Sequence, residues 1–508
     1  MPRFKPDNRE QGMMIAVSYD KQITFGTFEH TIDYIVENRV NTDIFNSRYK
    51  NDNTGATAYS PKVLLKIVLL AYSRGIMTSR DIERACQENV VFMAISGGQA
   101  PDFTTIAHFV SSMKEEIRNI FLDILLTCSQ LDLLGGTEFA IDGCKMSSNA
   151  SKEWSGTFEE LEKKREKLDD TIRFLLEKHK SLDSDEGNYV KEERKRRERQ
   201  IERIEKEAEK IERFLKENKP KKNDKAKREN QSNITDNESA KMKTSHGMQQ
   251  GYNGMVITDR KHQIVFKAEA FGRGQEHELL RPMLEGAKDN AEAISLGEGY
   301  FKGKRFIGDT GTYSIDNLEY LSGEKIDGYI PDHNFRQRDP RFRERNRYRP
   351  DKKRLYITED FTHREKTDDY ICPAGKILEF GHKRRVKNTY GKVYYANEYD
   401  CSGCVLRNRC LRKSNTRLRT LYIMSEYSGR NYIEEMKSKI DTEKGREIYS
   451  RRMGIVEPVF ANIQNAKQLR RFTLRTKAKV NIQWMLFCMV HNIEKIFRYG
   501  NYERLAEV

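Results

Sequence analysis

The sequence predicts a mixed α/β protein with a helical region in front and two insertions in its sheet. Three observations favour this fold class. Roughly the first 130 residues carry apolar positions at helical spacing, strand-like runs start at Thr137 and resume at Gly251, and two highly charged stretches interrupt the strands. The chain has 508 residues, which is enough to bury a large core without disulfides or metal ions.

Residues 1–130 are predicted to form a helical, DNA-binding domain. Pro61 starts an apolar helix that ends at Gly75, and Thr78 or Ser79 caps the next helix, RDIERACQENVVFMAI. Asp102 or Thr104 caps a third long helix, which is predicted to run toward Leu131.

The first two of these helices have the spacing of a helix-turn-helix, although an ordinary helical hairpin is the alternative. In a helix-turn-helix, the residues of the second helix that would contact DNA are Arg80, Arg84 and Gln87.

Residues 131–151 and 234–330 are predicted to form the first parts of a catalytic core. The strand TEFAIDGCKMSSN is followed by an antiparallel pair, YNGMVITD and IVFKAEAF, and by a helix from His277. A strand (RFIGDTGTYS), a helix (IDNLEYLSG) and a strand (KIDGYIPD) come next. Three antiparallel strands continued by parallel crossover units make a mixed sheet, and this order is that of the ribonuclease H-like folds. Residues 426–508 are predicted to add a C-terminal helical part to the core.

Residues 152–233 are predicted to form a coiled-coil hairpin and a flexible linker. Apolar side chains recur at heptad-like positions in two arms. They are Phe158, Leu161, Leu168, Ile172, Leu175 and Leu182 in the first arm, and Ile201, Ile204, Ala208, Ile211 and Leu215 in the second.

Residues 331–425 are predicted to form a second, basic insertion that contains cysteines. Ten basic residues lie from Arg336 to Arg354 inclusive, interleaved with Phe342 and Tyr348. Basic side chains with aromatic neighbours suit phosphate neutralisation and base stacking, and a disordered basic loop is the alternative. The predicted DNA-contacting residues here are Arg336, Arg338, Arg341, Arg343, Arg345, Arg347 and Arg349.

Four of the eight cysteines cluster in this second insertion: Cys372, Cys401, Cys404 and Cys410. Their number and softness suit a structural Zn²⁺, and free thiols in a reducing cell are the alternative. Eight cysteines in a chain of this length are too few for a disulfide scaffold.

The charge balance indicates a polyanionic partner. There are 92 Lys and Arg against 77 Asp and Glu, a formal net charge of +15. Nucleic acid explains this excess better than an anionic membrane surface does. Because there is no signal-peptide core and no apolar run of about 20 residues, we expect a soluble cytoplasmic protein without a membrane partner.

Three carboxylates are candidates for chemistry. Asp142 and Asp309 each follow an apolar strand and precede small residues, where α/β sheets place their sites. Glu457 precedes Pro458 and is predicted near a helix start, after a break at Gly454. Carboxylates on adjacent strands can hold divalent cations that activate water against a phosphodiester; a turn aspartate or a capping carboxylate is the simpler reading of each alone.

Several motifs together resemble the DDE transposases of bacterial insertion sequences, almost from end to end. The N-terminal helices resemble the helical domain of this group. FAIDGCKMSSNAS and IGDTGTYSIDNL resemble its first and second aspartate motifs, and YSRRMGIVEPVFANIQNAKQLRRF resembles its Tyr-Arg-Glu-Lys signature region.

The resemblance implies that Asp142, Asp309 and Glu457 bind catalytic Mg²⁺ or Mn²⁺, with Tyr449 and Arg452 in support near the transposon-end phosphates. The chain departs from the common signature in three places. Four residues instead of three separate Arg452 from Glu457, the second turn reads GDTGTYS, and Gln464 replaces the lysine, for which Lys467 could substitute.

The sequence therefore predicts a DNA transposase that cuts the ends of its element and joins them to target DNA. The resemblance implies double-stranded DNA partners, namely terminal inverted repeats and target, a homodimer on DNA, and a place at the bacterial nucleoid. A metal-dependent nuclease of the same fold and a non-catalytic, transposase-derived DNA-binding protein are the alternatives.

Overall fold

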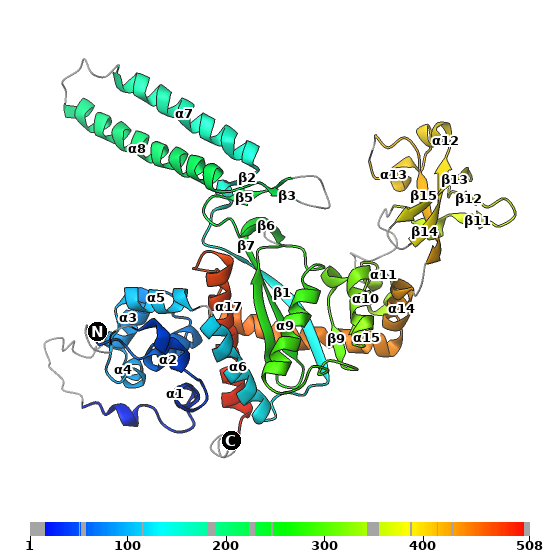
Figure 1. The fold of residues 1–508 in the computed structure, drawn as a ribbon. Coiled ribbons are helices and arrows are strands. Elements are labelled where there is room, and N and C mark those ends of the chain that lie inside the picture. The colour runs from blue at the N-terminus through cyan, green and yellow to red at the C-terminus, as the bar shows by residue number, and fades with distance from the viewer. Residues whose placement is uncertain are drawn as a thin grey trace, which may run out of the picture. The chain divides into compact units, whose positions relative to one another are not determined.

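A computed structural model describes most of the chain. The described residues are 16–49, 51, 57–113, 115–180, 188–222, 229–244, 247–342, 355–386, 389–413, 415–427 and 431–501. The chain divides into two compact units. Unit 1 comprises Met1–Thr312, Glu324–Asp327 and Arg451–Val508, and unit 2 comprises Tyr313–Gly323 and Gly328–Ser450. The predicted mixed α/β architecture with a helical N-terminal region is confirmed (Figure 1).

The N-terminal helices of unit 1 are α1 (Phe28–Asn38), α2 (Pro61–Ser73), α3 (Ser79–Glu88), α4 (Val90–Ile95), α5 (Phe103–Ser112) and α6 (Glu115–Gln130). Thr78 caps α3, because its side chain accepts the backbone N–H of Asp81 at 3.2 Å. The helix predicted over RDIERACQENVVFMAI is divided in two. Asn89 ends α3 and caps α4 by accepting the N–H of Val91 at 3.0 Å.

The third predicted helix is divided as well. Asp102 caps α5 by accepting the N–H groups of Thr104 and Thr105 at 2.9 and 3.1 Å. Met113 follows α5, and its non-helical ψ of 124° ends the helical backbone before α6 begins.

A mixed sheet lies mostly in unit 1; the residues of its last strand after Asp327 belong to unit 2. Its strands are β1 (Glu138–Ser147), β6 (Ala240–Thr244), β7 (Gly247–Asp259), β8 (Val265–Phe271), β9 (Arg305–Ile307) and β10 (Asp327–Tyr329). Their order is β10-β9-β1-β7-β6, with β8 also paired to β7. The first strand is antiparallel to β7 and parallel to β9, so β1 lies at the point where the sheet changes direction.

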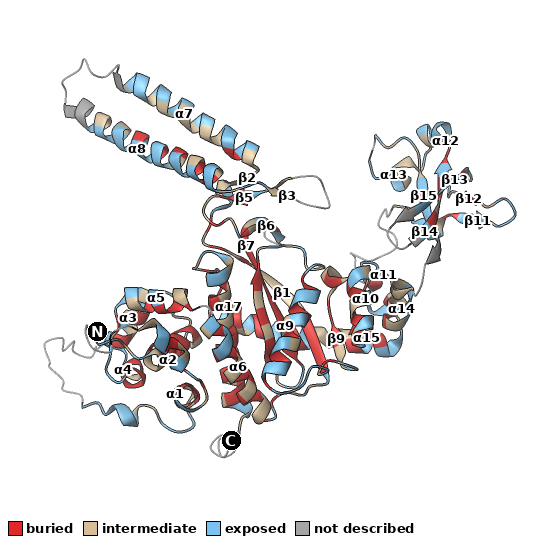
Figure 2. Ribbon diagram, viewed as in Figure 1, coloured by how far each residue is buried: buried red, intermediate tan, exposed pale blue. Residues whose placement is uncertain are grey.

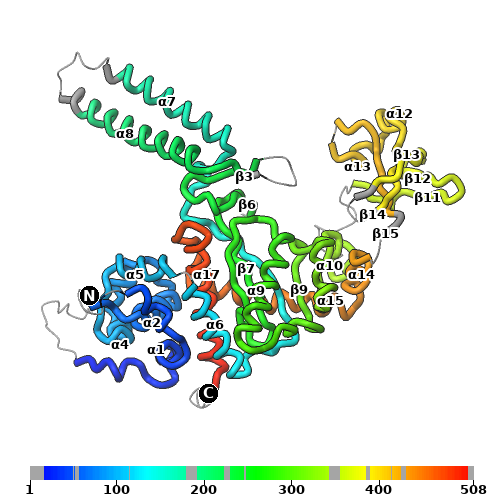
Figure 3. Tube along the Cα trace, viewed as in Figure 1, coloured from blue at the N-terminus to red at the C-terminus, as the bar shows by residue number. Residues whose placement is uncertain are grey.

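Helices α9 (Leu280–Ala293), α16 (Arg452–Ala461) and α17 (Lys477–Tyr499) pack against this sheet. The C-terminal α17 lies beside α6, although the two are far apart in sequence (Figure 3). Strands of the sheet and α17 are mostly buried (Figure 2). Trp484 of α17 is fully buried and donates its indole N–H to the carbonyl of Met255 at 3.1 Å. A Cβ at Gly254 would approach this indole ring to 3.0 Å, so the close packing requires glycine there.

The predicted hairpin insertion contains two long helices, α7 (Phe158–Lys180) and α8 (Asn188–Glu217), which lie side by side (Figure 1). Leu161, Ile211 and Phe214 form a small buried cluster between their bases. Short strands flank the hairpin in the sequence: β2 (Ser155–Gly156) precedes it, and β3 (Lys221–Lys222), β4 (Glu229–Asn230) and β5 (Ser232–Asn233) follow it. The heptad position Leu182 lies outside the described residues. Coiled-coil geometry stays a prediction.

Unit 2 is built on an antiparallel sheet in the order β11-β12-β13-β14-β15. These strands are β11 (Thr362–Arg364), β12 (Asp369–Ile371), β13 (Ile377–Val386), β14 (Thr389–Ala396) and β15 (Thr420–Tyr427). The helices of unit 2 are α10 (Ile315–Gly323), α11 (Phe335–Arg338), α12 (Glu398–Ser402), α13 (Arg407–Cys410), α14 (Tyr432–Ile440) and α15 (Glu443–Ser450). Among the described helices of both units, none combines the length and the apolarity that crossing a membrane demands.

The buried indole of α17 gives a test of this core. We expect Trp484→Ala to lower the free energy of unfolding by about 3–5 kcal/mol, because it removes a large buried side chain and leaves a cavity. Denaturant unfolding followed by circular dichroism measures the change. Met453→Ala is the control, since its side chain is 61% exposed and we expect a change within about 0.5 kcal/mol. Equal effects of the two substitutions would contradict the packing described above.

Candidate active site

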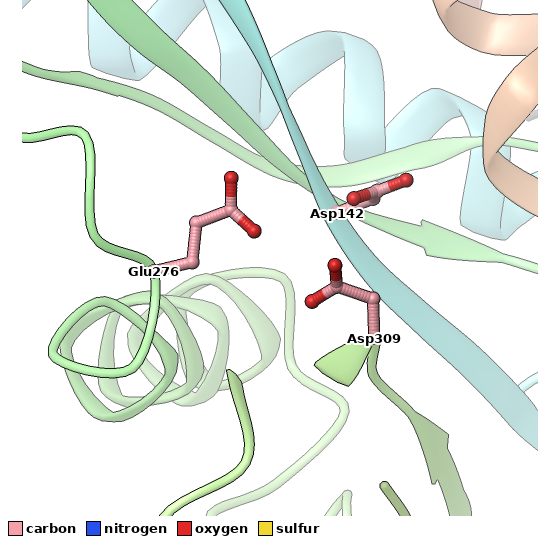
Figure 4. A group of neighbouring side chains, drawn as sticks. All are labelled: Asp142, Glu276 and Asp309. Carbon is pink, nitrogen blue, oxygen red and sulfur yellow. The ribbon is translucent and has the colours of Figure 1, made fainter. Parts of the chain in front are cut away.

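Three carboxylates from distant parts of the chain meet in unit 1. They belong to Asp142, Glu276 and Asp309, and one carboxylate oxygen of each lies within 4.8 Å of the other two. Asp142 is on β1, Glu276 is in the loop between β8 and α9, and Asp309 lies two residues beyond β9. Figure 4 shows the side chains of Glu276 and Asp309 extending toward the strand that carries Asp142. Asp142 and Asp309 therefore lie close together.

Two glycines leave the space that the three carboxylates occupy. A Cβ at Gly311 would lie 2.7 Å from Oε2 of Glu276 and 3.1 Å from Oδ1 of Asp309. A Cβ at Gly143 would lie 2.3 Å from the sulfur of Met255. A side chain at either glycine would therefore displace groups of the site. Asp309 is held by its own turn, since its Oδ1 accepts the backbone N–H of Gly311 at 2.9 Å.

Asp142 has one cationic neighbour that offsets its burial. Its carboxylate accepts a hydrogen bond from the guanidinium of Arg452, the first residue of α16, and both side chains are 12% exposed. Burial nevertheless raises the pKa of Asp142 to about 6; Arg452 opposes the shift and the neighbouring charge of Asp309 adds to it. The preceding residue, Arg451, pairs with the buried Glu138 of the same strand at 3.1 Å. Two consecutive arginines therefore attach α16 to β1.

Glu276 has weaker support. Its Oε1 accepts the amide of Asn253 at 3.1 Å and lies 3.9 Å from Nζ of Lys145. Burial raises the pKa of Glu276 to about 7, and the charges of Asp309 and Asp142 raise it further. At neutral pH the three carboxylates are therefore held together against their mutual repulsion.

A divalent cation fits this group of side chains. Carboxylate oxygens are the ligands that hard ions such as Mg²⁺ and Mn²⁺ prefer. The buried Oδ1 of Asn253 has no hydrogen-bond partner among the described residues, and it lies beside Gly143, where a Cβ would approach it to 2.5 Å. An oxygen of this kind can accept a hydrogen bond from a water molecule bound to such an ion.

Glu457 does not join the three carboxylates in this structure. The predicted break at Gly454 is absent, because α16 starts at Arg452 and continues past Pro458. The core-facing side of α16 carries Ile455, Val456, Val459 and Phe460. Glu457 lies off this side and is exposed. The role that the resemblance assigns to Glu457 stays a prediction.

The remaining signature residues have defined surroundings. Arg452 pairs with Asp142, and Tyr449 packs edge-on against Phe335 in unit 2 at 5.2 Å between ring centroids. Gln464, at the lysine position, hydrogen-bonds the thiol of Cys144, two residues beyond Asp142 on β1. Lys467 is fully buried and its Nζ pairs with Glu494 at 2.7 Å; its substitution for the signature lysine stays a prediction.

The predicted DNA-contacting residues of α3 share one side of that helix. Arg80, Arg84 and Gln87 are exposed, whereas Ile82 and Cys86 are buried. Arg80 also lies over the ring of Phe103 at 4.9 Å, and Arg84 lies 4.0 Å from Asp81. The arrangement leaves both arginine side chains accessible from solvent.

The basic segment of unit 2 is only partly described. Arg338 makes ion pairs with Asp332 and Asp441 at 2.5 and 2.6 Å, and Arg341 pairs with Asp339 at 2.7 Å. Arg336 lies 5.6 Å from the ring of Phe342. Three of the predicted phosphate-binding arginines therefore have partners within the unit. The others lie outside the described residues: Arg343, Arg345, Arg347 and Arg349.

Sequence reasoning missed Glu276. The residue directly precedes the helix predicted from His277, and an acidic residue at a helix start is ordinarily a capping residue. The single available signal is its place shortly after β8, a strand of the same sheet. Loop conformation, which no periodicity encodes, brings it to the two aspartates.

The raised pKa values of Asp142 and Glu276 predict a pH-dependent response to metal ions. Folding raises the pKa values of both carboxyl groups. The contribution of these two groups to the free energy of unfolding is therefore largest below about pH 4 and falls as the pH rises through about 6 to 7. Millimolar Mg²⁺ or Mn²⁺ should therefore raise the melting temperature more at pH 8 than at pH 5.5, as differential scanning fluorimetry can measure.

The variant Glu276→Gln sharpens this test. Without added metal at pH 8 it should melt about 2 °C or more above the parent protein, because it removes one of three repelling charges, and metal should stabilise it less. Glu292→Gln, an exposed change on α9, should leave both values unchanged. A metal response that is equal at both pH values and unaffected by Glu276→Gln would contradict the assignment of the ion to this group.

Comparison with known protein families places these features in context. A family model described as Transposase domain (DUF772) matches residues 17–112, which hold the N-terminal helices up to α5. A model described as Transposase DDE domain matches residues 371–497, which run from the sheet of unit 2 to α17 and include Glu457. No curated protein and no solved structure matches the chain. Transposase models thus match on both sides of the segment that brings the three carboxylates together, and in these two regions the chain is similar to the insertion-sequence DDE transposases.

Proposed function

We propose that the protein cuts the ends of its insertion sequence and joins them to target DNA in metal-dependent reactions at Asp142, Glu276 and Asp309. The observation that supports this most strongly is the meeting of three carboxylates within 4.8 Å in a chain whose family acts on DNA. Strand order gives further support, because β8, β7, β1, β9 and β10 are neighbours in one mixed sheet, as a ribonuclease H-like core would require.

A divalent ion held by these residues would activate water toward a phosphodiester and stabilise the leaving oxygen. In the cutting reaction, a water oxygen forms a bond to phosphorus while the bond from phosphorus to the 3′ oxygen breaks, and that oxygen leaves as a 3′-OH. In the joining reaction, the oxygen of this 3′-OH forms a bond to a phosphorus of target DNA while the bond from that phosphorus to the target's own 3′ oxygen breaks, and the displaced target strand leaves with a 3′-OH. Neither step forms a covalent bond between protein and DNA.

The side chains around the carboxylates have separate tasks in this proposal. Arg452 keeps the carboxylate of Asp142 oriented and partly neutralised. Lys145 is 29% exposed beside Glu276 and provides a positive charge toward which a phosphate can approach. The exposed side of α3 and the arginine-rich segment of unit 2 would bind the terminal repeats, and the need to hold two ends together implies a homodimer on DNA.

A strand-transfer assay tests the proposal directly. With the element's own ends, Mg²⁺ and a target plasmid, we expect joined products from the parent protein. Asp142→Asn and Asp309→Asn should each reduce cutting and joining by more than about 100-fold. Loss of a residue that only hydrogen-bonds a metal ligand already costs up to about 100-fold, and loss of a ligand itself should cost more. Joined products distinguish a transposase from a nuclease of the same fold, which would release only hydrolysed ends. Full activity of either variant would refute the proposal.

Glu457 and Glu276 can be separated by two measurements. We predict that Glu457→Gln loses strand transfer by about 100-fold or more, while it keeps the stabilisation by metal, because Glu457 is outside the carboxylate group in the DNA-free protein. Glu276→Gln should lose the metal stabilisation itself. Glu319→Gln, on α10, is the control for both assays. If Glu457→Gln retained full strand transfer, its predicted role as a metal ligand would be wrong.

A further inference from the structure

Unit 2 contains a sheet whose own hydrophobic core is small. The buried residues of this core are Phe361, Tyr370, Leu378, Tyr394, Ala396 and Leu421. Segments of this size with so few buried apolar side chains ordinarily need a disulfide or a metal ion to hold their loops. All the described cysteines are free thiols, so disulfides do not supply that support here.

Four cysteines from three segments line one pocket at the edge of this core. They are Cys372, Cys401, Cys404 and Cys410. Cys372 lies in the turn between β12 and β13, the next two lie in and just after α12, and Cys410 ends α13. The cavity measures about 30 Å³. Because one water needs at least about 10–15 Å³ on this measure, the space suits a single ion rather than an organic ligand.

Backbone contacts hold the cysteine-bearing segments around the pocket. Lys376 donates its backbone N–H to the sulfur of Cys372 at 3.3 Å, within a tight turn in which Gly375 has a φ of +76°. Such an N–H stabilises a thiolate sulfur. The ammonium group of Lys376 pairs with Asp400 at 3.2 Å, which joins the Cys372 turn to α12.

Two arginines fix the other segments. The guanidinium of Arg407 donates to the carbonyl of Cys401 at 2.7 Å, and that of Arg419 donates to the carbonyl of Cys410 at 3.0 Å. These contacts fix the backbone on either side of the pocket and place positive charge beside it. Burial raises the pKa of the Cys410 thiol and the three other thiols add to this shift, whereas Arg419 opposes it.

We propose that Cys372, Cys401, Cys404 and Cys410 bind one structural Zn²⁺ that fastens α12, α13 and the β12–β13 turn to the sheet of unit 2. Four soft sulfur ligands with no open position are typical of a structural rather than a catalytic zinc site. No three of the four sulfur atoms lie within 4.8 Å of one another, whereas the three carboxylate oxygens do. The cysteine side chains would therefore have to rotate to bind one ion. Each thiol that binds releases its proton to solvent.

Metal analysis of the full-length protein, purified under reducing conditions without added zinc, tests this proposal. We expect about one Zn²⁺ per chain, and about four of the eight thiols should react with a thiol reagent only after a strong chelator is added. Replacing the zinc with Co²⁺ should give the intense visible absorption of a tetrahedral thiolate site. Substoichiometric zinc together with four thiols that react equally with and without chelator would overturn the proposal.

Variants locate the ion. Cys404→Ala should lose most of the zinc and make unit 2 more sensitive to protease, whereas Cys86→Ala, in α3, should keep one Zn²⁺ per chain. If Cys404→Ala fails to fold, mass-spectrometric mapping of chelator-dependent alkylation in the parent protein identifies the same four residues. Zinc that stays bound in Cys404→Ala with unchanged thiol protection would contradict the site. Mg²⁺ stabilisation of unit 1 is a separate measurement, so failure here leaves the proposed transposase reaction untouched.

Discussion

Mutual repulsion among Asp142, Glu276 and Asp309 is the constraint on which the rest of unit 1 depends. Like charges in a partly buried site raise one another's affinity for protons, and burial adds to this effect, as the raised pKa values of Asp142 and Glu276 show. Such a group stays together only where the backbone holds the three side chains close to one another. Here a strand, a strand-to-turn junction and a loop each hold one carboxylate, and glycines clear the space between them.

Arg452 offsets part of this repulsion and links the site to the C-terminal region. It lies 310 residues from its partner Asp142 in the sequence, and Arg451 makes a second contact to the same strand through Glu138. The ion pair therefore forms only when α16 packs against β1. Trp484 and the other buried residues of α17 also join the C-terminal region to the sheet. The geometry of the carboxylate group and the stability of the core consequently depend on the same long-range packing.

The sheet of unit 2, by contrast, has only a small hydrophobic core. Intramolecular ion pairs such as Arg338 with Asp332 and Asp441 order part of its arginine-rich segment. A structural ion at the cysteine cluster would add the support that its few buried side chains cannot. The two metal sites that we propose differ in chemistry, hard oxygen ligands in unit 1 and soft sulfur ligands in unit 2, so each selects its own ion.

The sequence by itself determined most of the local structure and the two aspartates. Caps at Thr78 and Asp102, the alternating strands and the small residues after Asp142 and Asp309 act over a few positions, so their consequences can be read from the chain. Only the tertiary structure decided which third carboxylate reaches them. A loop places Glu276 beside the two aspartates. The packing of α16 leaves Glu457 on its exposed side, and Lys467 forms a buried ion pair with Glu494. These outcomes depend on contacts between distant segments, which local spacing does not specify.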